Sequence, residues 1–169
     1  MNRRSMLEIS AVTVLGLALL AGSAVGAPKA KVNKKLLVGS WALVSASAPS
    51  PEVQPFGPND GFAVFQANGR FALDLILSSL PKFASNNRAK GTADENKAIA
   101  QGSIAYFGTY SVNDADGVVT LHIERSSFPN WTGTDQKRII TSLTAEELKY
   151  TNPDASVGGT AELAWKRVK

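Results

Sequence analysis

Gly39-Ser40-Trp41 opens the first segment that is expected to form a β-strand, and Trp165-Lys166-Arg167 closes the last one. A closed β-barrel needs side chains that plug one of its ends. A tryptophan ring laid across the floor fills that space, and an arginine guanidinium stacked on its face adds a cation–π contact. We therefore expect Trp41 and Arg167 to form a barrel floor, while a core tryptophan beside a surface arginine stays the alternative.

Short segments of alternating apolar and polar residues fill the chain between these ends, and turn residues separate them. This pattern is typical of an all-β barrel or sandwich. Asn68-Gly69 favours a two-residue hairpin turn, because both positions of that turn need positive φ. We interpret the chain as an eight-stranded antiparallel up-and-down barrel with room for one small ligand. The expected strands are 41–46, 62–66, 70–77, 104–112, 118–125, 136–142, 148–152 and 160–168.

A polar stretch over 80–103 interrupts this series of strands. Thr92 and Glu95 have the spacing of a capping box, in which each side chain bonds the other residue's free backbone N–H. This predicts a short helix over 93–101, between the third and fourth strands. The stretch is too long for a plain connection, so we expect either a lid over the barrel mouth or a brace packed outside the barrel.

Residues 1–27 have the features of an export signal peptide. Arg3 and Arg4 precede an apolar run over 11–20, and small residues follow that run. The run is shorter than the roughly 20 apolar residues that a membrane-spanning helix needs. The adjacent arginines fit a twin-arginine signal, and the general secretory route stays open. We expect a periplasmic or secreted protein with no stable membrane anchor after cleavage.

Cleavage after Ala27 would leave one domain, which we divide into a flexible start over 28–35 and a barrel over 36–169. The signal carries two arginines and one glutamate, so its removal would lower the net charge from +4 to +3. The lysines are scattered, and no basic face with interleaved aromatic residues is visible, which argues against nucleic-acid binding. The chain has no cysteine, so neither a disulfide nor a lipid-anchored cysteine is expected.

Several short motifs follow one another in the expected barrel. They are 55–61 (PFGPNDG), 68–71 (NGRF), 106–110 (YFGTY), 122–124 (HIE) with Ser126, 128–133 (FPNWTG), Gln136 and Arg138. With the G-x-W triplet, this ordered set resembles the bacterial and fungal lipocalin-like domain family over about 36–168. The resemblance implies a calycin-type barrel that binds a small apolar ligand, and it implies no single activity. Leu121-His122 stands where a His-His pair is expected, which weakens any role for a doubled histidine.

His122 is the only histidine of the chain, so we expect no dedicated transition-metal site. His122 and Glu124 share one face of the strand 118–125, and the apolar residues that alternate with them share the other face. The alternation favours an apolar interior with His122 and Glu124 in solvent. The resemblance favours the opposite orientation, because both residues lie at motif positions. We expect His122 and Glu124 to face the cavity.

Arg138 is the expected partner of Glu124, because their strands should be neighbours and a buried charge needs a counter-charge. Together with His122, this pair would orient a ligand carbonyl, hydroxyl or carboxylate. Aromatic side chains are expected to supply the walls, with ordinary core packing as the alternative role. These wall residues are Phe71, Tyr106, Tyr110 and Trp131.

Two other functions stay open beside ligand binding. An isomerase or cyclase could use His122 as an acid or base on an apolar substrate in the same cavity. A structural module could instead fill its barrel with its own side chains, as eight-stranded barrels allow. We expect no cofactor, because the chain carries no cofactor motif, and it shows no nucleophile beside a visible base.

Overall fold

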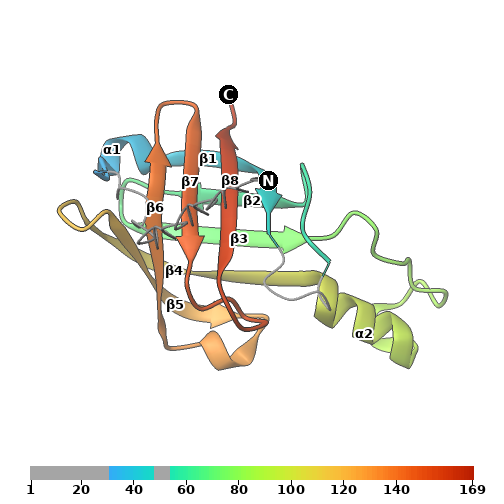
Figure 1. Ribbon diagram of the computed structural model, residues 1–169. Helices are drawn as coiled ribbons and strands as arrows, with labels where there is room; N and C mark the ends of the chain where they lie inside the picture. The colour runs from blue at the N-terminus through green and yellow to red at the C-terminus, as the bar shows by residue number, and fades with distance from the viewer. Residues whose placement is uncertain (1–30, 48–53) are drawn as a thin grey trace, which may run out of the picture.

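The computed structural model describes residues 31–47 and 54–169, and these form a closed antiparallel barrel (Figure 1). The strands follow one another around the barrel in chain order, and β1 pairs with β8 to close it. The strands are β1 (Gly39–Ala46), β2 (Gly61–Phe65), β3 (Arg70–Ile76), β4 (Ser103–Asn113), β5 (Val118–Ser126), β6 (Asp135–Leu143), β7 (Glu147–Asn152) and β8 (Ala161–Arg167). The expected up-and-down barrel is confirmed, and the sandwich is excluded. The expected signal peptide over 1–27 lies outside the described residues.

Alternation along each strand places its apolar residues inside the barrel, as the period of two in a strand requires. Because one face of every strand is buried, the hydrophobic pattern fixes the register of the sheet. Two strands show this clearly, with exposed fractions of 1–8% for Phe71, Leu73 and Leu75 of β3 and for Val119, Leu121 and Ile123 of β5.

The hairpin between β2 and β3 differs from the predicted two-residue turn. The N–H of Gln66 bonds the oxygen of Arg70 at 2.8 Å, and the N–H of Gly69 bonds the oxygen of Gln66 at 3.0 Å. The loop therefore has three residues, and of these only Gly69 has a positive φ, at 86°. A three-residue loop places its glycine last, in the left-handed region, so the Asn-Gly signal located the hairpin but misjudged its length.

The floor of the barrel is closed by a short helix, α1 (Lys34–Leu37), that the sequence did not predict. The Asn33 side chain caps it by accepting from the Lys35 N–H at 2.9 Å. The described part of the segment 28–35 is therefore folded, in contrast to the flexible start that was expected. Val32 and Leu37 explain the difference, because they are 1% and 0% exposed and cover the open end of the core.

The predicted floor contact is present. The Arg167 guanidinium lies over the Trp41 ring at 4.2 Å, and Trp41 is completely buried. The indole N–H donates to the Leu37 oxygen at 3.0 Å, which ties the ring to α1. Gly39 precedes this pair with a φ of +140°, and a Cβ there would lie 2.2 Å from an Arg167 nitrogen. The glycine of the G-x-W triplet thus makes room for the guanidinium.

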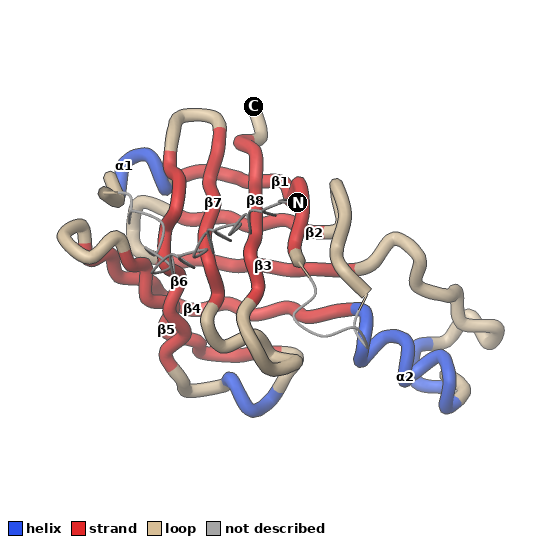
Figure 2. Tube along the Cα trace, in the orientation of Figure 1, coloured by secondary structure: helices blue, strands red, loops and turns tan. Residues whose placement is uncertain are grey.

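The second helix, α2 (Ala93–Gly102), begins where the capping box predicts. The Glu95 N–H donates to the Thr92 hydroxyl, and the Thr92 N–H donates to the Glu95 carboxylate at 2.8 Å. Figure 2 shows α2 beyond the ends of β3 and β4, where it projects away from the strands. Most of its residues are exposed, and only its last turn reaches the barrel. It therefore neither covers the mouth as a full lid nor packs along the barrel wall as a brace.

Two short 3₁₀-helices complete the described structure, η1 (Arg88–Lys90) before α2 and η2 (Pro129–Trp131) between β5 and β6. Over 31–47 and 54–169, no helix combines the length and the apolar character that crossing a bilayer requires.

Candidate functional site

The barrel interior divides into a packed half at the floor and a hollow half at the mouth. In the floor half, side chains such as Leu37, Leu121 and Leu148 leave a gap of only about 10 Å³. In the mouth half, a cavity of about 90 Å³ remains, which we call the inner chamber. Since a single water needs about 10–15 Å³ of such space, the inner chamber has room for a small chemical group. Its walls include Leu75, Ile104, Tyr106, Trp131, Arg138, Tyr150, Asn152 and Leu163.

Arg138 lies on β6, where it alternates with Gln136 and Ile140 and so points to the interior. Arg138 is only 2% exposed. Nη1 donates to the Lys137 oxygen at 2.8 Å and to Asn152 Oδ1 at 2.9 Å. Nη2 donates to the Tyr106 hydroxyl at 3.1 Å. All three acceptors are neutral, so the guanidinium is hydrogen-bonded but has no counter-charge among them.

Two aromatic rings hold the Arg138 guanidinium between them. Its Cζ lies 5.7 Å from the centroid of Trp131 and 5.8 Å from that of Tyr150. Trp131 comes from η2, and its ring packs edge-on against Tyr106 at 5.3 Å. Cation–π contacts of this kind gain strength when they are shielded from water. They help to keep an arginine inside an apolar barrel.

Two buried polar atoms of residues that line the inner chamber have no hydrogen-bond partner within the described residues. They are Nε of Arg138 and the hydroxyl of Tyr150. Burial raises the pKa of Tyr150 well above its usual value, so this phenol stays neutral and keeps its proton. Burial opposes the charge of Arg138, but its contacts with Tyr106 and Tyr150 raise the pKa of the guanidinium overall. The inner chamber therefore contains a fixed cation and a spare hydroxyl donor.

A second hollow adjoins the inner chamber, and we call it the outer groove. It measures about 460 Å³ and lies between the last turn of α2 and the chain that follows β3. Leu77, Leu80 and Pro81 give it an apolar side. Gln54, Ala100, Gln101 and Val157 line both the outer groove and the inner chamber, so the two spaces meet at the barrel mouth.

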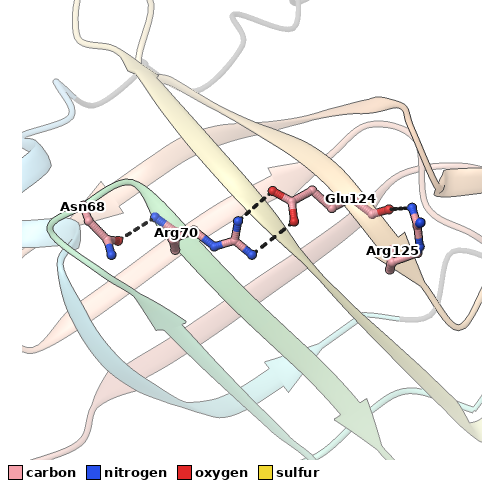
Figure 3. Close-up of polar contacts among 4 residues, drawn as sticks. All are labelled: Asn68, Arg70, Glu124 and Arg125. Carbon is pink, nitrogen blue, oxygen red and sulfur yellow. Dashed lines mark hydrogen bonds and ion pairs between the residues drawn. The ribbon is translucent and has the colours of Figure 1, made fainter.

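His122 and Glu124 lie on the outer wall and not in the cavity, which corrects the sequence prediction. Their side chains are 42% and 43% exposed, whereas the apolar residues that alternate with them face inward. Glu124 pairs with Arg70 through two bonds of 2.7 and 3.1 Å, and not with Arg138 (Figure 3). The apolar face takes the interior because burial of two ionisable side chains would cost the free energy of removing their charges from water, whereas burial of three aliphatic side chains carries no such cost.

The register between β4 and β5 also favours this outward orientation. It shifts between Phe107 and Gly108, so that Glu124 has no residue directly opposite. Strands approach closely at this bulge, since a Cβ on Gly108 would lie 1.9 Å from the backbone oxygen of His122. Glycine is the residue that such a contact requires. Gly108, the central residue of the 106–110 motif, therefore serves the close packing of β4 against β5 in the barrel wall.

His122 belongs to a chain of polar contacts across three neighbouring strands. Its Nδ1 lies 2.7 Å from Asp135 Oδ1, and its Nε2 lies 3.1 Å from the Ser111 hydroxyl. The spacing resembles that of a Ser-His-Asp triad. The group nevertheless lies on the outer face of the sheet, where the His122 and Asp135 side chains are 42% and 63% exposed, and not in a pocket that excludes water. It links β4, β5 and β6, and it gives the cavity no acid or base.

The expected aromatic walls are divided between the two halves of the barrel. Tyr106 and Trp131 border the inner chamber. Phe71 and Tyr110 lie in the packed half, where the ring of Phe65 stacks on Phe71 at 6.1 Å and meets Tyr110 edge-on at 5.3 Å. Of the seven predicted ligand contacts, Arg138, Tyr106 and Trp131 are thus the ones that the fold brings together at the cavity.

Asn152 was missed as a site residue, although the sequence contains the signal for it. It shares the inward face of β7 with Leu148 and Tyr150. A buried polar side chain is normally hydrogen-bonded, so a polar residue on such a face predicts a buried hydrogen-bond partner. That partner is Arg138, which lies on the neighbouring strand. In the described part of the chain, no group of three or more His, Asp or Glu side chains is placed to hold a metal ion.

The match to a protein family agrees with the barrel. A sequence model described as a lipocalin-like domain matches residues 38–168, which span β1 to β8. No curated protein matches the chain. Among solved structures, a redesigned β-barrel matches with 14% sequence identity and a TM-score of 0.45, over 80% of this chain and 95% of that chain.

Proposed function

Because the chain belongs to the family of lipocalin-like domains, we propose that it is an exported protein that binds a small, largely apolar molecule at its barrel mouth. The observation that carries this proposal is the hollow mouth half, where Arg138 and Tyr150 keep unpartnered polar atoms beside a cavity of about 90 Å³. A buried polar atom without a partner costs about 1–3 kcal/mol, so an incoming molecule that supplies partners would recover that free energy.

The two connected spaces suit a molecule with two parts. The inner chamber holds about 90 Å³, which is well below the roughly 300–1,000 Å³ of a typical ligand pocket. The outer groove, at about 460 Å³, is large enough for the rest of such a molecule. A head group would enter the inner chamber beside Arg138, and an apolar body would lie against Leu77, Leu80 and Pro81.

The export part of the proposal depends on residues 1–27. Arg3 and Arg4 before the apolar run favour the twin-arginine route, which carries folded proteins. Replacement of both arginines by lysine should then retain the uncleaved chain in the cytoplasm, as measured by fractionation and intact-mass analysis. Normal export of this variant would point to the general secretory route, and recovery of only uncleaved chain from the unmodified protein would contradict export.

Native mass spectrometry of the protein purified from its own periplasm tests the binding proposal directly. We expect a co-purified small molecule that is lost on denaturation. The variant Ala161→Leu should reduce its occupancy, because Ala161 lines the inner chamber and is 7% exposed. Ala164→Leu on the outer face of the same strand is the matched control. Empty protein that also binds none of a panel of apolar molecules would favour the structural module instead.

A further inference from the structure

We infer that the ligand carries an acid group, a carboxylate or an equivalent anion, that pairs with Arg138 in the inner chamber while its apolar body lies in the outer groove. This inference rests on the proposed binding function and adds the chemical class of the ligand. It starts from the charge of Arg138, which forms no ion pair with any carboxylate in the described part of the chain.

Arg138 is a permanent cation inside an apolar barrel. A guanidinium does not lose its proton in a protein, so the charge cannot be removed as it can for a buried lysine. Buried charges are normally paired. Within the described residues, Asp60 is the one buried carboxylate, and its oxygens accept from the Gly57 and Ser78 N–H groups at 2.8 and 2.9 Å. No ion pair joins Asp60 to Arg138, so among residues 31–47 and 54–169 no carboxylate pairs with this guanidinium.

The free donors of Arg138 match the geometry of an acid group. A guanidinium has five N–H donors, and the contacts with Lys137, Asn152 and Tyr106 use three of them. One N–H on Nε and one on Nη2 remain. Two N–H donors of one guanidinium can bind the two oxygens of a carboxylate side by side. The Tyr150 hydroxyl, which is also unpartnered, can donate a third bond to the same group.

The surroundings favour an amphipathic acid over a free inorganic anion. The inner chamber adjoins the outer groove, whose Leu77, Leu80 and Pro81 would contact an apolar chain. A free anion would satisfy Arg138 but would leave this apolar surface in water. A molecule with an acid at one end and a hydrocarbon body at the other satisfies both regions, as burial of apolar area adds to the affinity.

The test compares two probes of eight carbons each, one with an anionic carboxylate head group and one with a neutral hydroxyl. Binding of octanoate and of octan-1-ol to the purified protein is measured at pH 7.5 by calorimetry, with tryptophan fluorescence as a second readout. We expect octanoate to bind at least ten times more tightly than octanol, and its affinity to fall as the pH drops towards the ordinary carboxyl range near about 4.3. Equal affinity for the two probes would overturn the acid assignment and leave the binding function standing.

Variants locate the charge effect. Arg138→Met should lower the octanoate affinity at least tenfold and change the octanol affinity less than threefold, while Arg138→Lys should retain part of the preference. Arg70→Met is the matched control on the outer wall and should change neither affinity. Should Arg138→Met fail to fold, the lysine variant and the probe pair on the unmodified protein still decide the question. An Arg138→Met protein that binds octanoate normally would overturn the inference.

Two further outcomes separate this inference from the function beneath it. Acetate, which has the acid but no apolar body, should bind far more weakly than octanoate. Acetate that binds as tightly as octanoate would identify a small-anion site and overturn the amphipathic assignment. If no probe binds and native mass spectrometry shows no co-purified molecule, the proposed function fails, and the acid inference fails with it.

Discussion

Both ends of the barrel interior hold an arginine against aromatic rings, yet the two arginines are satisfied to different degrees. At the floor, Arg167 lies 4.2 Å from the Trp41 ring and donates to the backbone oxygens of Leu36, Val38 and Ala145. At the mouth, Arg138 is held between two rings but keeps an unpartnered Nε beside a cavity. The first arginine completes the fold, whereas the second keeps donors available.

The largest effect should come from breaking the floor. Trp41→Ala is expected to lower the free energy of unfolding by about 3–5 kcal/mol, because it removes a fully buried ring and leaves a void beneath α1. Urea denaturation measures this change. Phe107→Ala is the matched control, since Phe107 is 43% exposed on the outer wall and should cost far less. A loss below about 1 kcal/mol for Trp41→Ala would show that the floor closes by other means.

The mouth arginine should respond in the opposite direction. Arg138→Met is expected to leave the free energy of unfolding unchanged or to raise it by about 1–3 kcal/mol in the absence of ligand, because an apolar side chain replaces a buried charge. The lost bonds to Tyr106 and Asn152 offset part of the gain. Urea denaturation of ligand-free protein measures the change. A destabilisation above about 3 kcal/mol would mean that Arg138 serves the fold as Arg167 does.

The fold could be predicted closely because each local signal agreed with the global one. The apolar alternation predicted the eight strands of the barrel, and Thr92 with Glu95 predicted the start of α2. α1 was missed because four residues, Lys34–Leu37, are too few to show a helical period. Only the open barrel end above Trp41 explains why this segment folds, and an open end is a property of the closed sheet and not of the local sequence.

The site could be predicted only in part, for a different reason. Arg138 is a charged residue on a strand face that also carries Ile140, whereas His122 keeps to the polar face of its strand with Glu124. Arg138 lies on the same face as Ile140 and is buried, whereas His122 lies opposite Leu121 and Ile123 and is exposed. For His122, the apolar alternation of its strand predicts the observed outward orientation. The family motif predicts the wrong one, because a motif residue can belong to the barrel wall as well as to the cavity.

A carboxylate at the mouth gives the two ends different responses to pH. Asp60 accepts from the Gly57 and Ser78 N–H groups, and chiefly the bond from Gly57 lowers the pKa of Asp60 below 3.8. Its stabilisation is therefore complete above about pH 4 and is lost as the pH falls through the lowered pKa. Arg167 at the floor keeps its charge throughout this range.

The variant Asp60→Asn sharpens this difference between the ends. It should lower the free energy of unfolding by about 1–2 kcal/mol at pH 7, because an amide replaces an ionised acceptor of two backbone bonds. The same variant should flatten the decline in stability between about pH 4 and pH 2, as followed by urea denaturation at a series of pH values. A decline identical to that of the unmodified protein would assign the acid sensitivity to other carboxylates.

The smallest effect is expected on the outer wall, where a third arginine is paired but exposed. Arg70 and Glu124 form a two-bond ion pair, with side chains 44% and 43% exposed. Water screens such a pair, so Glu124→Gln should change the free energy of unfolding by only about 0.2–1 kcal/mol, and less in high salt. A double-mutant cycle with Arg70→Met measures the coupling. The same variants should leave octanoate binding within threefold of the unmodified protein. A larger change in binding would mean that the outer wall is coupled to the inner chamber, and that burial alone does not distinguish Arg138 from Arg70.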